Sequence, residues 1–471
     1  MTVKGKNMKI FDTLTKKKAD LVPVNGKNVG IYLCGPTVYD YGHLGHGRSA
    51  IVFDILRRYL TYRGYNVNFV RNWTDIDDKT IERAEKEGIS VKELTEKFIQ
   101  VYKKDFEELN ILQPDFDPKP TEHIDEIIDL IKKLFDRGHA YILDDGVYYD
   151  IATFPEYGLL SGQLLSELKK GVRVEVSDDK RNPGDFVMWK FEKPGEPSWE
   201  SPWGMGRPGW HIECSAMSMK YLGGEFDIHC GGQDLVFPHH EDEIAQARGA
   251  GFGYARYWMH NGFLNIDNEK MSKSLGNFFT LKEVFEKFSP LTVRFFLVSA
   301  HYRAPLNFSD VTLRQAESGL KRYNNFILRI KEIAGKAKKD ESGNRIPDIT
   351  GLIKKAKNSF DAGLEDDLNI SKSLASLSDF VGDINSIVDS NNLASGGAVK
   401  IIDFMKMINS VLGIFTFEKE ILSEDIENKI EERNRARKEK DYEKADRIRE
   451  NLLDMGIILE DTRDGTRWKK A

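Results

Sequence analysis

The stretch from Gly30 to Asp78 constrains the fold more than any other part of this chain. It opens with GIYLCGPTVYD, an apolar, β-prone run that contains a Gly-Pro break. In GHLGHGRSAIVFDILRRYLTYRGY, apolar residues recur at helical spacing until Gly64, and NVNFVRNWTDIDD predicts a second strand with polar residues at its end. Strand, glycine-rich turn, helix and strand make a βαβ unit, whose ligand site is the crevice at the carboxyl ends of the strands. The sequence therefore predicts an α/β fold with a parallel sheet.

A second group of strand signals lies much further along the chain. A helical stretch is predicted from Ile81 to Leu112, and a mixed segment follows to about Trp203 that contains YILDDGVYYDI, typical of a β-hairpin. Strand signals return in FDIHCGGQDLVF and YWMHNGFLNI. This return indicates an insertion between two halves of one nucleotide-binding fold.

Beyond Phe278 the periodicity is helical almost throughout, with polar breaks at GKAKKDESGNRIPD and DSNNLASGGA that predict linkers. The segment from about Glu420 to Ala471 is expected to open with one highly charged helix, IENKIEERNRARKEKDYEKADRIRENLLDMG, and to close with a short strand-like tail. Periodicity alone favours a solvated helix laced with opposite-charge pairs.

Length and composition describe an ordinary multidomain protein. A chain of 471 residues exceeds what one hydrophobic core serves, so roughly two to four domains are expected. No apolar run approaches the roughly 20 residues that span a bilayer, and no apolar block follows the first lysines, which predicts a cytoplasmic protein. The net charge of -6 neither supports nor excludes a nucleic-acid partner. Three cysteines are too few for a disulfide framework, which favours reduced thiols.

The segment FPHHEDE concentrates two histidines and three carboxylates. If a helix starts near Pro238, His239 and Glu243 share one face of it. Cys214 lies 25 residues before His239 (239 - 214 = 25), and Cys34 ends the first strand, in the crevice where the later strands also end. Cysteine, histidine and carboxylate are all zinc ligands. The spacing is also compatible with an ordinary surface pair and with cysteines that pack as small hydrophobes.

Two further motifs carry positive charge or hydrogen-bond donors. His43 and His46, one turn apart at the start of the predicted helix, would suit an anionic phosphate, although two surface histidines would give the same pattern. KMSKSLGN contains Lys270 and Lys273 in a polar loop, where they could stabilise the charge that grows on a leaving pyrophosphate. The alternative is a generic basic loop.

Taken together, these motifs resemble a known enzyme family. HLGH and KMSKS resemble the two signatures of class I aminoacyl-tRNA synthetases. CGPTVYDYGHLGHGR, NWTDIDDK, SPWGMGRPGWHIECSAM, FPHHEDE and KMSKSLGN, in this order, resemble the cysteinyl-tRNA synthetase family, and the resemblance covers nearly the whole chain. It implies a Rossmann-like parallel-sheet catalytic domain split by an insertion, then an α-helical region and a small C-terminal anticodon-binding domain. The expected parts are residues 1–120 and 204–278 for the two catalytic halves, 121–203 for the insertion, 279–335 for a stem-contact helical region, 348–419 for a helical bundle and 420–471 for the anticodon-binding domain.

The resemblance also implies a reaction and its participants. The carboxylate of L-cysteine would attack the α-phosphate of ATP, supplied with Mg²⁺, to give cysteinyl-adenylate, and tRNA(Cys) would then accept the cysteinyl group. One Zn²⁺ per chain would select the cysteine thiolate over the serine hydroxyl, which shape alone distinguishes poorly. The chain is expected to act as a monomer, without a membrane.

Roles for individual residues follow from the same resemblance. The implied zinc ligands are Cys34, Cys214, His239 and Glu243, while His240, Glu241 and Asp242 resemble residues that support the zinc or line the adenylate pocket. The other expected contacts are His43 and His46 with the phosphates, Lys270 and Lys273 with the pyrophosphate, Gly231, Gly232 and Asp234 with adenosine, Thr74 and Trp210 with the amino acid, and Tyr442, Asp446 and Asp461 with the anticodon. Cys230 matches no ligand position and is expected to line the pocket.

Some features depart from the family or leave alternatives. His46 stands where many members carry asparagine, and Trp73 stands where a smaller apolar residue is frequent; both could alter the packing of the pocket. A zinc-dependent ligase that joins cysteine to an amino sugar in mycothiol synthesis shares the adenylation chemistry but lacks the full anticodon-binding region. A non-catalytic tRNA-binding paralogue is the other alternative, against which the intact HLGH, KMSKS and ligand motifs argue.

Overall fold

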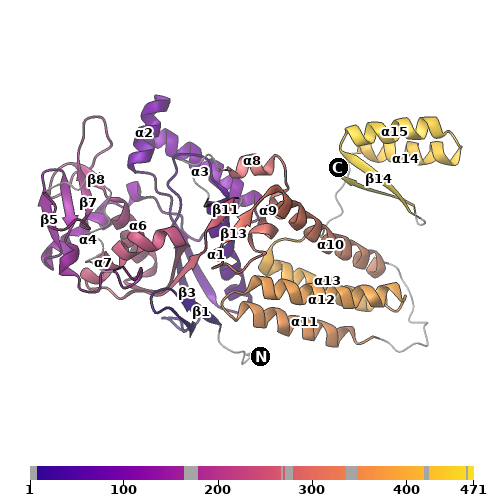
Figure 1. The fold of residues 1–471 in the computed structure, drawn as a ribbon, viewed down its shortest axis with the longest axis horizontal. Coiled ribbons are helices and arrows are strands. Elements are labelled where there is room, and N and C mark those ends of the chain that lie inside the picture. The colour runs from indigo at the N-terminus through magenta and orange to yellow at the C-terminus, as the bar shows by residue number, and fades with distance from the viewer. Residues whose placement is uncertain are drawn as a thin grey trace. The chain divides into compact units, whose positions relative to one another are not determined.

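The computed structural model describes residues 8–163, 179–266, 269–270, 279–335, 347–417, 424–462 and 465–470. Its central sheet contains four parallel strands in the order β10-β9-β3-β4, of which Figure 1 labels β3. Two come from the first half of the catalytic region and two from the second, and this return confirms the predicted split α/β fold. The strands are β3 (Asn28–Leu33), β4 (Asn66–Arg71), β9 (Glu225–Gly232) and β10 (Tyr254–Asn261).

Helix α1 (Leu44–Tyr62) connects β3 to β4 and completes the predicted βαβ unit. His43 is its N-cap: the imidazole Nδ1 accepts hydrogen bonds from the backbone amides of Gly45 and His46. Arg63 ends the helix, and Gly64 follows with a φ of 84°, a conformation that glycine adopts without strain.

The helical stretch predicted from Ile81 to Leu112 is wrong as a single element, because it contains two helices. Helix α2 (Asp78–Glu87) ends at Gly88, which has a φ of 66°. Helix α3 (Val91–Glu108) begins after Ser90, which exchanges capping hydrogen bonds with Glu93. A left-handed glycine followed by a capping box outweighs the continuous helical periodicity on either side.

The insertion folds as a helix and a four-stranded antiparallel sheet in the order β5-β6-β7-β8. The predicted hairpin is confirmed as β5 and β6, which pair from Ala140 opposite Tyr149 to Leu143 opposite Gly146. The elements are η1 (Pro120–Glu122), α4 (Ile124–Asp136), β5 (Ala140–Leu143), β6 (Gly146–Tyr149), η2 (Ile151–Thr153), β7 (Phe186–Phe191) and β8 (Gly206–Pro208).

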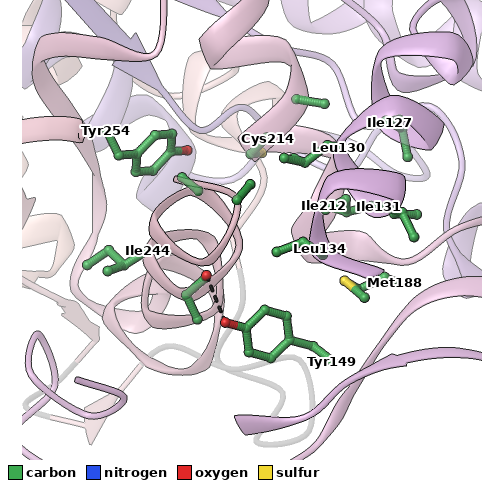
Figure 2. Close-up of a cluster of buried hydrophobic side chains, with 14 of the residues drawn as sticks. Ile127, Leu130, Ile131, Leu134, Tyr149, Met188, Ile212, Cys214, Ile244 and Tyr254 are labelled. Carbon is green, nitrogen blue, oxygen red and sulfur yellow. Dashed lines mark hydrogen bonds between the residues drawn. The ribbon is translucent and has the colours of Figure 1, made fainter. Parts of the chain in front are cut away.

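One hydrophobic core joins the insertion to the second catalytic half. Figure 2 shows side chains of α4, among them Leu130 and Leu134, beside Ile212, and Ile244 belongs to the same buried cluster. Ile212 and Ile244 belong to α6 (Trp210–Leu222) and α7 (Glu241–Gly249). The buried hydroxyl of Tyr149 donates a 2.9 Å hydrogen bond to the carbonyl of Ala245, so the insertion sheet is fastened to α7 (Figure 2).

Smaller elements complete the catalytic region. An N-terminal hairpin contacts β10, and a separate three-stranded sheet has the order β12-β11-β13. These elements are β1 (Lys9–Asp12), β2 (Lys17–Asp20), η3 (Gln233–Leu235), η4 (Val236–His240), β11 (Leu264–Ile266), β12 (Glu269–Lys270), α8 (Leu281–Phe285), α9 (Pro290–Leu297) and β13 (Leu306–Phe308).

Four helices follow as a bundle: α10 (Asp310–Gly335), α11 (Ile349–Leu364), α12 (Ile370–Asp389) and α13 (Ser395–Leu412) (Figure 1). The break predicted at DSNNLASGGA separates α12 from α13, whereas most of the break at GKAKKDESGNRIPD lies outside the described residues. Buried Arg294 of α9 ties the bundle to the catalytic region, because it donates to the carbonyls of Leu109 and Leu412 and to the carboxylate of Asp54.

Residues 416–471 form a separate compact unit. The single charged helix predicted here is wrong, because α14 (Glu424–Lys438) and α15 (Tyr442–Asp454) are divided by a turn in which Lys440 has a φ of 63°. The strand-like tail is the hairpin β14 (Ile457–Thr462) and β15 (Gly465–Lys470). Leu452, Ile457 and Leu459 form the core of the unit. Across the described parts of the whole chain, none of the helices combines the length and apolarity needed to cross a bilayer.

Candidate active site

A cavity of about 410 Å³ lies at the carboxyl ends of the four parallel strands. Each strand contributes a residue at or just beyond its end: Cys34 after β3, Arg71 of β4, Gly232 of β9 and Asn261 of β10. The sheet therefore delivers side chains that are far apart in the sequence to one crevice, as parallel α/β sheets do.

Next to this cavity, thiol, imidazole and carboxylate side chains converge. The Sγ of Cys34 lies 3.7 Å from the Sγ of Cys214, 3.6 Å from Nε2 of His239 and 3.5 Å from Oε1 of Glu243. His239 Nε2 and Glu243 Oε1 are 3.2 Å apart. The side chains come from the end of β3, from α6, from η4 and from α7, so the residues expected as zinc ligands do meet in space.

Hydrogen bonding adds to the effect of burial on the pKa of Cys34 but opposes it at Cys214. Burial raises the pKa of Cys34, and the hydrogen bond to Cys214 adds to the effect. Burial also acts to raise the pKa of Cys214, but the hydrogen bond that it accepts from Cys34 prevails and lowers that pKa to about 6. These opposite shifts favour ionisation of Cys214 before Cys34. A bound divalent cation would favour the thiolate form of both.

The donor set fits a tetrahedral, thiophilic metal ion. Two sulfurs at zinc–sulfur distances of about 2.3 Å would lie about 3.8 Å apart at a tetrahedral angle, close to the 3.7 Å between Cys34 and Cys214. His240 is a fifth candidate ligand, since single donor atoms of Cys34, His239, His240 and Glu243 all lie within 4.8 Å of one another. The Nε2 of His240 is buried without a hydrogen-bond partner among the described residues.

Buried partners orient the donors of this cluster. The Oε2 of Glu243 accepts hydrogen bonds from Nε2 of His229 at 2.8 Å and from the hydroxyl of Tyr254 at 2.6 Å. His239 shares a 2.9 Å hydrogen bond with His211 through its Nδ1, and Trp210 stacks on its ring at 4.3 Å. Such outer contacts set ring orientation and ligand basicity in metal sites.

The two histidines of HLGH lie together at the start of α1. Their rings stack with centroids 3.6 Å apart, and both line the cavity. Nδ1 of His43 accepts the amides of Gly45 and His46, while Nδ1 of His46 accepts the amide of His43. In the neutral form, the ring proton of each therefore lies on Nε2, so each histidine can donate from that atom at a helix N-terminus.

The structure places the other expected contacts unequally. Gly232, Asp234 and Trp210 line the cavity. Thr74 and Gly231 are not among the lining residues; Thr74 is buried, and its hydroxyl accepts a hydrogen bond from Asn72. Lys270 is described only as part of strand β12, and Lys273 lies outside the described residues.

The expectation that Cys230 lines the pocket is wrong. Cys230 is fully buried within β9, and its thiol donates a 3.3 Å hydrogen bond to the carbonyl of Tyr32. Burial raises the pKa of Cys230, so it is a protonated core thiol. The alternation of side chains along β9 decides this, because it turns Cys230 toward the core.

The residues expected at the anticodon differ in environment. Tyr442 and Asp446 are exposed on α15. Asp461 is also exposed, but it is held by Arg433, whose guanidinium donates to both carboxylate oxygens at 2.6 and 2.7 Å, and by Arg437. Arg433 is buried, so it is not the surface cation that the charged helix suggests.

Sequence reasoning missed three residues of the cavity. Tyr102 of α3 lines it and hydrogen-bonds Nδ1 of His46 at 3.1 Å. Arg48, the arginine that follows HLGHG, is buried and donates to the carbonyls of Gly262 and Ala304 across the crevice. Arg71 lines the cavity from the end of β4. For Arg71, the signal available in the sequence was a cationic residue at the end of an apolar strand.

Comparison with known proteins agrees with the motifs and the geometry. Residues 20–318 match the family described as tRNA synthetases class I (C) catalytic domain. Residues 359–416 match the DALR domain, and residues 420–468 match the cysteinyl-tRNA ligase anticodon binding domain.

Full-length relatives are similar across the whole chain. The cysteine–tRNA ligase of Carboxydothermus hydrogenoformans is 49% identical over 98% of this chain and 100% of its own length. That of Thermodesulfovibrio yellowstonii is 46% identical over 98% of this chain and 99% of its own length. Among solved structures, Mycobacterium tuberculosis methionyl-tRNA synthetase has the same fold, with a TM-score of 0.62 and 16% identity over 82% of this chain and 90% of its own. The family matches and the full-length identity together show that this chain belongs to the cysteine–tRNA ligase family of class I tRNA synthetases.

Proposed function

We propose that this protein is a cytoplasmic, monomeric enzyme that ligates L-cysteine to tRNA(Cys) at the expense of ATP. The observation that carries the proposal is the position of a Cys-His-Glu cluster beside a helix N-terminus bearing two histidines, in one strand-end crevice. The first feature suits a thiol and the second suits a phosphate. Cysteine carries the thiol, and ATP carries the phosphates.

Different groups of residues would bind the metal ion and the separate parts of the substrates. Cys34, Cys214, His239 and Glu243 would hold Zn²⁺, whose contribution when bound is affinity for a thiolate over a hydroxyl. His43 and His46 would donate hydrogen bonds to the phosphates of ATP, which enters with Mg²⁺. The further assignments are Lys270 and Lys273 to pyrophosphate, Gly231, Gly232 and Asp234 to adenosine, and Thr74 and Trp210 to cysteine.

Adenylate formation requires positioning and charge stabilisation more than covalent help from the protein. The carboxylate of cysteine forms a bond to the α-phosphorus as the bond to pyrophosphate breaks. The cysteinyl group then passes to the terminal ribose of tRNA, and AMP leaves. The match of residues 420–468 to an anticodon-binding family favours tRNA over an amino sugar as the acceptor.

Isotope exchange between ATP and pyrophosphate tests this function directly. Wild-type protein should catalyse exchange that depends on cysteine and is not supported by serine at equal concentration, and it should charge tRNA(Cys). Charging without cysteine-dependent exchange would contradict the adenylate route. Absence of both activities from folded, zinc-loaded protein would favour a non-catalytic tRNA-binding role.

A further inference from the structure

Arg71 is a buried cation that the catalytic scheme above does not use. It is the last residue of β4, is only 4% exposed and lines the same cavity as Cys34 and His46. Its guanidinium carbon lies 4.5 Å from the ring centroid of Phe106 and 5.1 Å from that of Trp73. These aromatic faces hold the guanidinium in place but supply no hydrogen-bond acceptor.

The other buried arginines show what Arg71 lacks. Within the described residues, four of them donate to carbonyls or carboxylates, and Arg71 alone has no hydrogen bond or ion pair to its guanidinium; its Nε is fully buried without a partner. The four with partners are Arg48 with backbone carbonyls, Arg207 with Asp78 and Glu196, Arg294 with Asp54 and backbone carbonyls, and Arg433 with Asp461.

The nearby carboxylates are already paired with other groups. Asp117 accepts from Lys103 at 2.8 Å and from the indole of Trp73 at 3.3 Å. Asp54 is bound by Arg58 at 2.8 Å and by Arg294 at 2.6 Å. Burial lowers the pKa of Arg71 to about 10, so the guanidinium still carries its charge near neutral pH. An unpaired buried charge is costly, unless a bound ligand supplies the opposite charge.

We infer that Arg71 is a further substrate-binding residue, which donates charge-assisted hydrogen bonds to an anionic oxygen group of the substrates in the cavity. The inference rests on the proposed function, because two anions must meet there: the carboxylate of cysteine and the phosphates of ATP. Their repulsion is strong in a desolvated pocket, and a cation fixed at the end of β4 offsets it. Tyr102 connects the two regions, since it packs against Trp73 and hydrogen-bonds His46.

Arg71→Met removes the charge and keeps a side chain of similar length, and Arg71→Lys restores a cation. The Met variant should raise the KM for ATP or for cysteine in pyrophosphate exchange by about 10- to 100-fold, the effect of losing a charge-assisted hydrogen bond. The substrate with the larger increase identifies the anion. Its melting temperature should stay at or above that of wild type, because an unpaired buried charge is removed. The Lys variant should recover part of the loss.

Arg294→Met is the matched control, because Arg294 is equally buried but fully paired away from the cavity. It should lower the melting temperature and leave both KM values unchanged.

Calorimetric titration of ATP and of cysteine, each alone, adds a readout that needs no turnover. At least one of the two substrates should bind Arg71→Met about tenfold more weakly than it binds wild type. Kinetic and binding constants within twofold of wild type, or losses that follow a lowered melting temperature and are not restored by lysine, would overturn the role. If wild type binds both substrates but catalyses no exchange, the proposed function fails while the binding comparison still decides the role of Arg71.

Discussion

At the scale of single residues, the thiols differ more than their shared chemistry suggests. Cys34 and Cys214 face each other at 3.7 Å among imidazole and carboxylate donors, whereas Cys230 donates to a backbone carbonyl inside the sheet. The same residue type is therefore a candidate metal ligand at two positions and a core residue at the third. Neighbouring donor atoms decide which role is open to each thiol.

We expect Cys214→Ser to lose most of the bound metal and most cysteine activation, since a hydroxyl is a much poorer zinc ligand than a thiolate. Elemental analysis of purified wild type should find about one zinc per chain, as a single four-ligand site predicts. Cys230→Ser is the matched control and should retain both zinc and activity. Full zinc and normal cysteine-dependent exchange in Cys214→Ser would show that the ligand assignment is wrong.

Asp105 of α3 makes the free energy of unfolding depend on pH. It is 7% exposed, its Oδ2 has no hydrogen-bond partner among the described residues, and burial, with the charge of Glu108 nearby, raises its pKa to about 6. An unfolded aspartate titrates near pH 4, so the folded state binds this proton more tightly. The stabilising contribution of Asp105 is therefore fully present below about pH 4 and is lost as the pH rises through about 6.

Asp105→Asn should consequently be more stable than wild type at pH 7, by about 2 kcal/mol, and should show no such gain at pH 4. Urea unfolding at the two pH values measures the difference. The exposed neighbour Glu107, changed to Gln, should show no comparable pH-dependent gain. An equal effect of Asp105→Asn at both pH values would mean that a changed hydrogen bond, not the buried charge, sets its stability.

At the scale of elements, turns and helix caps set the ends of helices that the periodicity of the sequence does not predict. The α2–α3 junction needs a left-handed residue at Gly88, and the α14–α15 junction uses Lys440 and the capping side chain of Asp441. Both interrupt segments whose helical pattern continues. Local backbone geometry therefore determines the length of these helices.

A pair of glycine substitutions tests this reasoning. Gly88→Ala should destabilise the protein by about 1 kcal/mol, because alanine is strained at a φ of 66°. Gly382→Ala, at an exposed position inside α12 with open space for a Cβ, should stabilise it by about 0.5–1 kcal/mol. Midpoints of urea unfolding report both changes. The same sign for the two substitutions would contradict the conformational explanation.

At the scale of the whole molecule, residues 416–471 form a unit with its own small core, whereas the cavity belongs entirely to residues 8–415. This division separates the chemistry of activation from the exposed Tyr442, Asp446 and Asp461, which remain proposed anticodon contacts. The finer domain boundaries expected from the motifs also remain predictions.

Removal of residues 416–471 should therefore leave cysteine-dependent pyrophosphate exchange nearly intact and sharply weaken charging of tRNA(Cys). Tyr442→Ala in the full chain is the milder counterpart and should weaken charging about tenfold or more, as expected when one base loses its aromatic stacking partner. The two assays on each variant separate the steps. Loss of exchange in a folded truncated protein would show that the C-terminal unit supports the catalytic region. Unchanged charging would favour the alternative that α14 and α15 are solvated helices with no role in tRNA binding.

What the sequence alone determined was the order of strands and helices in the βαβ unit, the return of the sheet after the insertion, and the family. These features are local or are carried by long motifs. Only the tertiary structure showed that Cys230 faces the core, that Asp461 is paired with Arg433, and that Arg71 lines the cavity with no hydrogen-bond partner among the described residues. Pairing and burial depend on side chains brought together from distant segments. The periodicity of the sequence does not predict these long-range contacts. The packing of the folded chain therefore decides which charged side chains are paired within the protein and which are available to a substrate.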